Sequence, residues 1–283
     1  MGLNGIIERL FAGRWIAGET FEDALRVAMR FNSHKISVLI NYLGEDISDP
    51  KEVDNTVAEY SSLINIISKS KLNASISIKP TQIGYSISEK LFFKNYSYIL
   101  NLASKRKIFL WLDMEDIDAI ESTIDAYLNN FDGKNSGICI QAYLKRSAQD
   151  IRRIVKRGGI VRLVKGAYSP KHGGFGSRAL IDNNYKKLLY YLFLNSKQFM
   201  VATHDAHEID YAVKMNRKWR RNVVFGMLNG INNRYAASLA KNKEKVAIYI
   251  PYGPNWISYS YRRLKEEGHA ITIIKSLGRR QSI

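Results

Sequence analysis

The sequence contains one cysteine and lacks any long hydrophobic run. The single Cys139 excludes an intrachain disulfide, and its apolar surroundings indicate a small core residue. No apolar stretch reaches the roughly 18 residues that a membrane-spanning helix needs. Residues 1–18 include Glu8, Arg9 and Arg14 and have no apolar centre, so they do not resemble a signal peptide. These absences predict a cytoplasmic protein, and they leave a peripheral membrane contact open.

Acidic residues are also scarce. The chain has 43 Lys and Arg against 26 Asp and Glu, a net charge of +17, and residues 214–283 hold 15 basic against 3 acidic residues. Such an excess attracts an anionic membrane surface, a redox partner or nucleic acid, and it also occurs as plain surface charge. Because the chain carries no nucleic-acid recognition motif, we expect no nucleic-acid partner.

Short apolar runs alternate with segments of helical spacing along the whole chain. We expect strands at residues 36–42, 74–78, 107–112, 137–140, 160–164, 199–203, 223–228 and 245–250. We expect helices within residues 1–33 and at 52–70, 88–103, up to 128, 147–156, 180–195, 208–219, 233–241 and 254–267. Eight strand–helix units with short connections are typical of a closed parallel barrel.

The predicted fold is therefore an α/β protein with a (β/α)₈ barrel of the TIM type. Residues 1–283 would form a single domain, with residues 1–33 as an N-terminal helical segment and the last helix over the barrel mouth. An open doubly wound sheet is the alternative. No Gly-x-Gly-x-x-Gly follows the first strand, so the usual dinucleotide site of that fold has no candidate here.

Polar residues gather where the predicted strands end. Lys79, Asp113, Gln141 and His204 each follow an apolar strand, and Arg162 and Lys165 interrupt the fifth one. A charge in a buried strand costs several kcal/mol unless it is paired, so one explanation of the Arg162–Lys165 segment is a structural ion pair. Since all strand ends of a barrel open onto one face, the pattern equally predicts one polar, cationic pocket.

The predicted last helix is strongly basic. Arg262 and Arg263 are followed by Glu266, which lies on the same helix face as Arg263. A guanidinium binds a carboxylate with two parallel hydrogen bonds, so this pair could hold a small anion. A solvated basic helix without a ligand explains the same charges.

Seven sequence blocks occur in order at these positions: Tyr42–Glu45, Lys79 with Thr81-Gln82, Leu112–Glu115, Gln141–Leu144, Arg162–Tyr168, Ala202–His204, and Tyr249 through Arg262-Arg263-Leu264. Together they resemble the flavin-dependent proline dehydrogenase family in its single-function form, from residue 18 to about residue 267. The chain departs from the family pattern with Gly226 in place of a usual Gln, Asp205 in place of a common Asn, and Pro80 in place of an aliphatic residue.

The resemblance implies oxidation of L-proline to Δ1-pyrroline-5-carboxylate, with hydride transfer to N5 of a non-covalently bound FAD. It implies catalytic roles for Asp113 and Arg162. It implies substrate binding by Lys79, Leu163, Ala167, Tyr168, Tyr249, Arg262 and Arg263. It implies cofactor binding by Met114, Gln141, Arg162, Lys165, Gly166, Ala167, Thr203, His204 and Glu266. The expected partners are L-proline and an electron acceptor that the sequence does not identify, a quinone or another redox protein.

Two other functions remain open at this point. One is a barrel enzyme that binds an anionic substrate without flavin, and the other is a basic nucleic-acid-binding protein. His204 and His207 have a His-x-x-His spacing, but we identify no carboxylate-rich third ligand nearby, so we expect no metal site.

Overall fold

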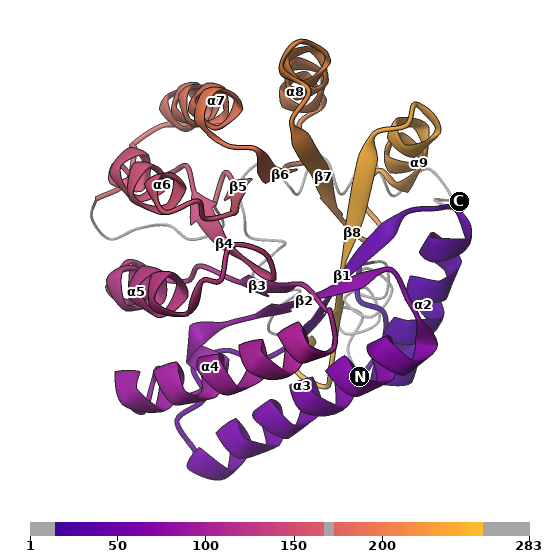
Figure 1. Cartoon of the computed structure of the whole chain (residues 1–283), viewed down its shortest axis with the longest axis vertical. Helices are drawn as coiled ribbons and strands as arrows, with labels where there is room; N and C mark the ends of the chain where they lie inside the picture. Colours follow the sequence, from indigo (N-terminus) through magenta and orange to yellow (C-terminus); the bar gives the residue numbers. More distant parts are fainter. Residues whose placement is uncertain (1–14, 167–172, 257–283) are drawn as a thin grey trace, which may run out of the picture.

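A computed structural model describes residues 15–166 and 173–256, and these residues form a closed barrel of eight parallel strands (Figure 1). The strands follow one another around the barrel in chain order, and β8 closes it by pairing with β1. Their bounds are β1 Ser37–Tyr42, β2 Ala74–Ile78, β3 Leu110–Leu112, β4 Ser136–Gln141, β5 Val161–Val164, β6 Gln198–Ala202, β7 Asn222–Leu228 and β8 Lys245–Tyr252. The predicted (β/α)₈ barrel is confirmed.

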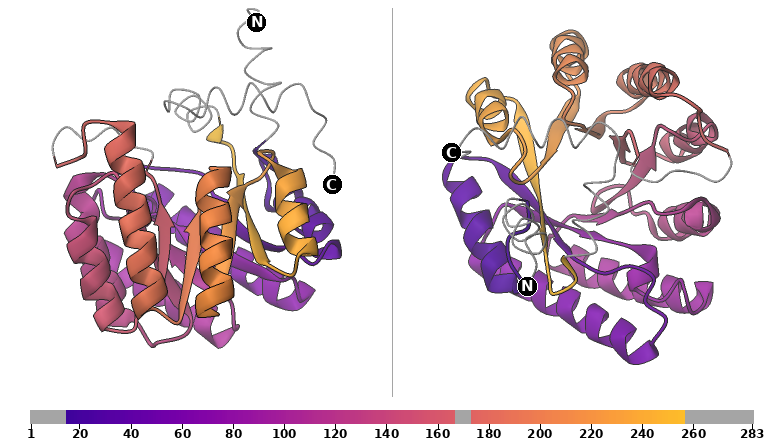
Figure 2. Two further views of the ribbon diagram at one scale, coloured as in Figure 1. Left: turned by 90° about the horizontal axis from the view of Figure 1, so that it is seen from above. Right: turned by 180° about the vertical axis from the view of Figure 1, so that it is seen from behind.

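The helices lie around the outside of this barrel, one after each of the first seven strands (Figures 1 and 2). Their bounds are α2 Phe21–Ser33, α3 Pro50–Ser70, α4 Glu89–Lys105, α5 Ile120–Asn130, α6 Ser147–Lys156, α7 Arg178–Asn195, α8 Ala206–Trp219 and α9 Asn233–Lys241. Two short 3-10 turns, η1 Pro80–Gln82 and η2 Ile117–Ala119, follow β2 and β3. In the part of the chain that the structure describes, no helix combines the length and the apolar character needed to cross a membrane.

Side chains at the helix starts explain several of these boundaries. Thr20 and Asp23 form a capping box at the start of α2, because each side chain bonds to the other residue's backbone N–H. The helix therefore begins at Phe21. Residues 15–20 were predicted to be helical, but they form no helix. Ser88 and Ser177 are the N-caps of α4 and α7. Each serine side chain accepts a hydrogen bond from the backbone N–H three residues later, that of Leu91 or Leu180.

The third strand is shorter than predicted. It begins at Leu110 because α4 continues past the expected end, and Lys107 turns the chain with a φ of 59°. Inside the barrel, the Trp111 ring fills the space above Gly137, where an added Cβ would lie 2.4 Å from the ring. A small residue on β4 thus accommodates the largest side chain of β3. The predicted last helix at 254–267 extends beyond the described residues.

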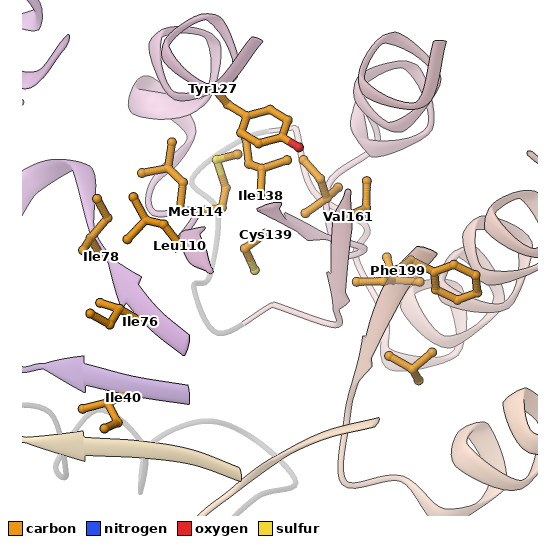
Figure 3. Close-up of a cluster of buried hydrophobic side chains, with 14 of the residues drawn as sticks. Ile40, Ile76, Ile78, Leu110, Met114, Tyr127, Ile138, Cys139, Val161 and Phe199 are labelled. Atoms are coloured by element: carbon orange, nitrogen blue, oxygen red, sulfur yellow. The ribbon is translucent and has the colours of Figure 1, made fainter. Parts of the chain in front are cut away.

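Alternate residues of each strand face opposite sides of the barrel wall. A small hydrophobic cluster that includes Leu39, Trp111, Met200 and Ala247 lies inside the barrel, whereas the main core lies between the strands and the helices. Figure 3 shows Ile138 and Val161 beside Tyr127 of α5, with Cys139 on the other side of β4. The Tyr127 hydroxyl accepts a hydrogen bond from the Ile160 backbone at 2.8 Å, which fixes α5 to the start of β5. The alternation places Ser77, Arg162 and Tyr249 toward the barrel interior.

Candidate active site

Asp113 lies at the centre of a buried polar group at the carboxyl ends of the strands. Its backbone N–H bonds to Ile78 O at 2.8 Å, which extends the pairing of β3 with β2 by one residue. Oδ1 accepts hydrogen bonds from Ser77 Oγ, at 2.5 Å, and from the Arg162 guanidinium. Oδ2 accepts one from the Tyr249 hydroxyl at 3.2 Å and lies 3.6 Å from Lys79 Nζ. One carboxylate therefore connects side chains from β2, β5 and β8.

The charges of this group stabilise one another. Burial raises the pKa of Asp113, but the positive charges of Arg162 and Lys79 outweigh it and lower the pKa of that carboxyl overall. Burial opposes the charged form of Arg162, yet the attraction of Asp113 raises its pKa above the usual value. Arg162 is 5% exposed, and its guanidinium lies 5.5 Å from the Trp111 ring centre and 5.8 Å from that of Tyr249. Both residues of the pair remain charged at neutral pH.

Two further carboxylates lie beside Lys79. Glu45 Oε1 is 3.1 Å from Lys79 Nζ, so the ammonium lies between Glu45 and Asp113. Glu115 accepts two hydrogen bonds of 2.8 Å from Thr81, one from the backbone N–H and one from the hydroxyl. Burial raises the pKa of Glu115 to about 7, against the opposing effects of Lys79 and Thr81. Glu115 thereby fixes the η1 turn directly after Lys79.

Gln141 ends β4 and is held from the neighbouring strand. Its side-chain amide donates to the Met114 carbonyl at 3.0 Å. The remaining amide oxygen is buried, and it has no hydrogen-bond partner among residues 15–166 and 173–256. Nε of Arg162 and the Tyr143 hydroxyl are among the other buried polar atoms without a partner in that same part of the chain. An accepting and a donating atom without partners at adjacent strand ends indicate a ligand that both accepts and donates hydrogen bonds.

Lys165 follows β5 directly and is bound by two carboxylates. Its Nζ lies 2.5 Å from Asp182 Oδ1 on α7 and 2.9 Å from Asp205 Oδ2 at the start of α8. Gly166 comes next, with a φ of 111°, and a Cβ at this position would lie 1.9 Å from Cδ1 of Tyr143. Both the backbone conformation and the close ring require glycine here.

His204 and Thr203 follow β6. The backbone N–H of Leu228 donates to His204 Nε2 at 3.3 Å, which links the ends of β6 and β7. Thr203 Oγ1 accepts from the Asp205 backbone N–H at 3.2 Å. The β6 end is therefore ordered by local hydrogen bonds and lies beside the Lys165 group, since Asp205 belongs to both.

Comparisons with known proteins identify the family to which this barrel belongs. A family model described as proline dehydrogenase matches residues 24–275. The chain is 32% identical to proline dehydrogenase 1 of Bacillus subtilis (strain 168), over 95% of this chain and 91% of that protein. The chain belongs to the proline dehydrogenase family. It is 29% identical to the proline dehydrogenase of Deinococcus radiodurans, over 90% of this chain and 86% of that protein.

The fold of this proline dehydrogenase family member also occurs within a longer protein. Proline utilization A of Bdellovibrio bacteriovorus, in a structure inactivated by N-propargylglycine, superposes with a TM-score of 0.84 at 23% identity. The match covers 92% of this chain and 33% of that one, so the present chain spans about a third of the longer protein. At this identity the likeness shows the barrel fold. The chain is thus an oxidoreductase of proline catabolism built on a TIM barrel.

The structure brings most of the expected site residues of this family to one end of the barrel. Lys79, Arg162 and Tyr249 each contact Asp113, and the Arg162 guanidinium lies over the Tyr249 ring. Gln141, Lys165, Gly166, Thr203 and His204 follow on the ends of β4, β5 and β6.

Two expected residues stand apart from that group. Leu163 is fully buried and lies on the face of β5 opposite Arg162, with Ile140 and Val201 as its paired neighbours. The structure does not bring its side chain to the Asp113 group. The Met114 side chain is buried in the main hydrophobic core, and its carbonyl, rather than its side chain, contacts Gln141 (Figure 3). Ala167, Tyr168, Arg262, Arg263 and Glu266 lie outside the described residues.

Sequence reasoning missed several residues of the site. Ser77 contacts Asp113, Glu45 contacts Lys79, and Asp182 contacts Lys165. Glu115 binds Thr81 in the turn after Lys79. Glu45 and Glu115 each end a sequence block that resembles the family, and that position was the available signal. Ser77 precedes Lys79 by two residues, so strand alternation alone places it on the same face.

Proposed function

We propose that this enzyme oxidises L-proline to Δ1-pyrroline-5-carboxylate and that FAD takes the electrons. The ring carbon C5 would lose a hydride, and the resulting C=N bond forms as the nitrogen lone pair is drawn in and the N–H proton leaves. Membership of the family supports proline as the substrate. The observation that carries the proposal is the buried Asp113 group, in which Lys79, Arg162 and Tyr249 converge on one carboxylate.

The residues present suit a flavin. A bound flavin would supply the hydride acceptor, and its ring edge carries both hydrogen-bond donors and acceptors. The amide oxygen of Gln141 and Nε of Arg162 are buried without partners in the described part of the chain and could serve that edge. Gly166 lets the backbone approach closely. The residues proposed to hold the cofactor are Met114, Gln141, Arg162, Lys165, Gly166, Thr203 and His204, together with Ala167 and Glu266 outside the described residues.

The substrate would lie on the Asp113 side of this cofactor. Loss of a hydride from C5 requires a neutral ring nitrogen, because a protonated amine has no lone pair to form the C=N bond. Lys79 and Arg162 favour loss of that proton by charge repulsion. Asp113 holds both cations in place, and Tyr249 is fixed against it. We propose that Arg262 and Arg263 bind the carboxylate and that Ala167 and Tyr168 line the ring; these four lie outside the described residues.

An absorption spectrum tests the proposal directly. The purified protein should show the absorption bands of oxidised flavin in the blue region of the visible spectrum. Anaerobic L-proline should bleach them, because one L-proline reduces each bound flavin and no oxidant is present to reoxidise it. D-proline is the matched control ligand, because it has the same ring and carboxylate with the opposite configuration at Cα. A flavin spectrum that L-proline leaves unchanged would contradict the substrate, and a purified protein that binds no added FAD would contradict the cofactor.

A further inference from the structure

The ammonium of Lys165 lies in a pocket of acidic side chains. Lys165 follows Arg162 by three residues, and the alternation of β5 turns the two side chains to opposite sides of the strand. Arg162 points into the barrel, whereas Lys165 reaches α7 and the start of α8. Its Nζ bonds to Asp182 at 2.5 Å and to Asp205 at 2.9 Å, and it lies 5.9 Å from the ring centre of Tyr185.

A third carboxylate completes this pocket. Glu208 lies in the first turn of α8 and is 2% exposed, and one oxygen from each of Asp182, Asp205 and Glu208 lies within 4.8 Å of the others. Burial raises the pKa of Glu208, with Lys165 and Lys186 opposing the shift. Burial also raises the pKa of Asp205, but its hydrogen bond to Lys165 and the attraction of that charge lower it overall. Asp205 is therefore ionised at neutral pH.

Three clustered carboxylates are a common metal-binding arrangement, but here a cation is already present. Two of the three bind the Lys165 ammonium at hydrogen-bond distance, so a metal ion would have to displace it. An ammonium has three N–H donors. Within residues 15–166 and 173–256, two of these donors are used by Asp182 and Asp205, which leaves one for a further acceptor.

The charges of this pocket do not add up to a cation. One ammonium faces two bound carboxylates, so these three groups together carry a charge of −1, and an ionised Glu208 makes the group more negative. Arg178 lies 3.7 Å from Asp182 and Lys186 lies 3.8 Å from Glu208, but both cations are more than half exposed, so water screens their charges. This differs from what Lys165 alone suggests, because an isolated ammonium beside a flavin would strongly favour the negatively charged reduced form. The paired ammonium still donates a hydrogen bond, but its field is largely cancelled.

We propose that Asp182 and Asp205 tune the flavin: they hold the Lys165 ammonium at the end of β5 and cancel its charge, which keeps the reduction potential of the cofactor low. The inference rests on the proposed function, because it assumes a flavin within reach of Lys165. It assigns to Asp182 and Asp205 a role in setting the driving force for proline oxidation. In this arrangement Lys165 would position its neighbours at the end of β5 and donate a hydrogen bond, without acting as an uncompensated positive charge.

The midpoint potential of the bound flavin, measured by anaerobic reduction against reference dyes, tests this inference. Asp182→Asn removes one negative charge, and Asp205 still holds Lys165. The equilibrium constant for two-electron reduction should rise about 10-fold, which corresponds to about 30 mV. Asp205→Asn also removes one negative charge, so it should shift the potential in the same direction. The Asn side chain preserves the N-cap that Asp205 gives α8. Asp182→Glu keeps the charge and should keep the wild-type potential.

Asp125→Asn is the control variant. Asp125 on α5 pairs with Arg153 on α6, so the change breaks a carboxylate–cation pair that includes neither Lys165 nor its two carboxylates. Its flavin should have the wild-type potential. Potentials of Asp182→Asn and Asp205→Asn that equal the wild-type value or fall below it would overturn the inference. A purely structural role would lower the melting temperature and the flavin content of these variants without moving the potential, which also overturns it.

The two proposals fail in different ways. A wild-type protein that binds no flavin refutes the proposed cofactor, and the inference falls with it. A wild-type protein with normal flavin reduction by L-proline, and Asn variants of unchanged potential, refutes the tuning role alone.

Discussion

Ser77 Oγ on β2 donates a hydrogen bond of 2.5 Å to Oδ1 of Asp113, and it accepts a hydrogen bond of 3.3 Å from NH1 of Arg162. The hydroxyl thus bridges the two residues proposed to be catalytic. It is fully buried, so no water can replace it easily. This small side chain sets the distance between the carboxylate and the guanidinium.

We expect Ser77→Ala to reduce kcat/KM for L-proline about 10-fold. The alanine removes one hydrogen bond to the ionised carboxylate, and such bonds contribute about 1.5–3 kcal/mol. Steady-state kinetics with L-proline measure the effect. Ser75→Ala is the matched control, because Ser75 lies two residues earlier on the same strand face and its hydroxyl donates to the Val38 carbonyl at 3.2 Å. Equal losses in the two variants would contradict the bridging role.

The barrel itself could be predicted from the sequence because its strands are made of short β-branched runs at regular intervals. Runs such as Ile76–Ile78 and Val161–Val164 bury one face toward the helices, and the turn residues between them are polar. The start of β3 was misplaced because Lys107 and Ile108 belong to the turn that ends α4, and an apolar residue such as Ile108 can pack in that turn as well as in a strand.

The site was predicted in part because polar residues at strand ends stand out against apolar strands. Their partners did not stand out. Asp182 is the fifth residue of α7, and its contact with Lys165 depends on how α7 packs. Strand alternation predicts that the Lys165 side chain points away from that of Arg162. It does not predict the two carboxylates that bind the Lys165 ammonium, because they come from separate elements.

Glu115 should make the stability of the protein depend on pH. Burial raises the pKa of this carboxyl to about 7 in the folded protein, from 4.5 in the absence of burial. The folded state therefore holds a proton that the unfolded state releases between about pH 4.5 and pH 7. Stability from this group is fully present below that range and decreases as the pH rises through it, by up to about 3 kcal/mol.

Urea unfolding at several pH values between 5 and 8 measures this dependence. Glu115→Gln keeps the shape and cannot titrate, so the difference between the wild type and this variant isolates the contribution of Glu115. We expect the variant to lose less stability than the wild type as the pH rises. Parallel pH profiles for the two proteins would show that Glu115 titrates normally.

Gly166→Ala should destabilise the end of β5. The added methyl group would lie 1.9 Å from the Tyr143 ring, and the φ of 111° is unfavourable for any residue with a side chain. We expect a loss of at least about 2 kcal/mol in the free energy of unfolding, together with weaker FAD binding, since the ring or the backbone must move. Urea unfolding and FAD titration measure the two effects.

Gly158→Ala separates the clash from the backbone strain. Gly158 also has a positive φ, 78°, but an added Cβ would meet nothing within 4 Å. This control should lose only the cost of the backbone conformation, about 1 kcal/mol, and should bind FAD as the wild type does. A Gly158→Ala variant as unstable as Gly166→Ala would show that the Tyr143 contact has no effect.

The arginine pair gives the sharpest test of the substrate. If Arg262 and Arg263 bind the proline carboxylate, Arg262→Met or Arg263→Met should raise the KM for L-proline about 100-fold, which corresponds to about 3 kcal/mol for the lost charged hydrogen bonds. Flavin content should remain at the wild-type level, because the substitutions remove contacts to the substrate rather than to the cofactor. Arg217→Met is a suitable control, since Arg217 is exposed on α8 and carries the same charge. A pair variant with a normal KM would place the carboxylate elsewhere, and Lys79 would then be the next cation to test, because it already lies 3.6 Å from Asp113.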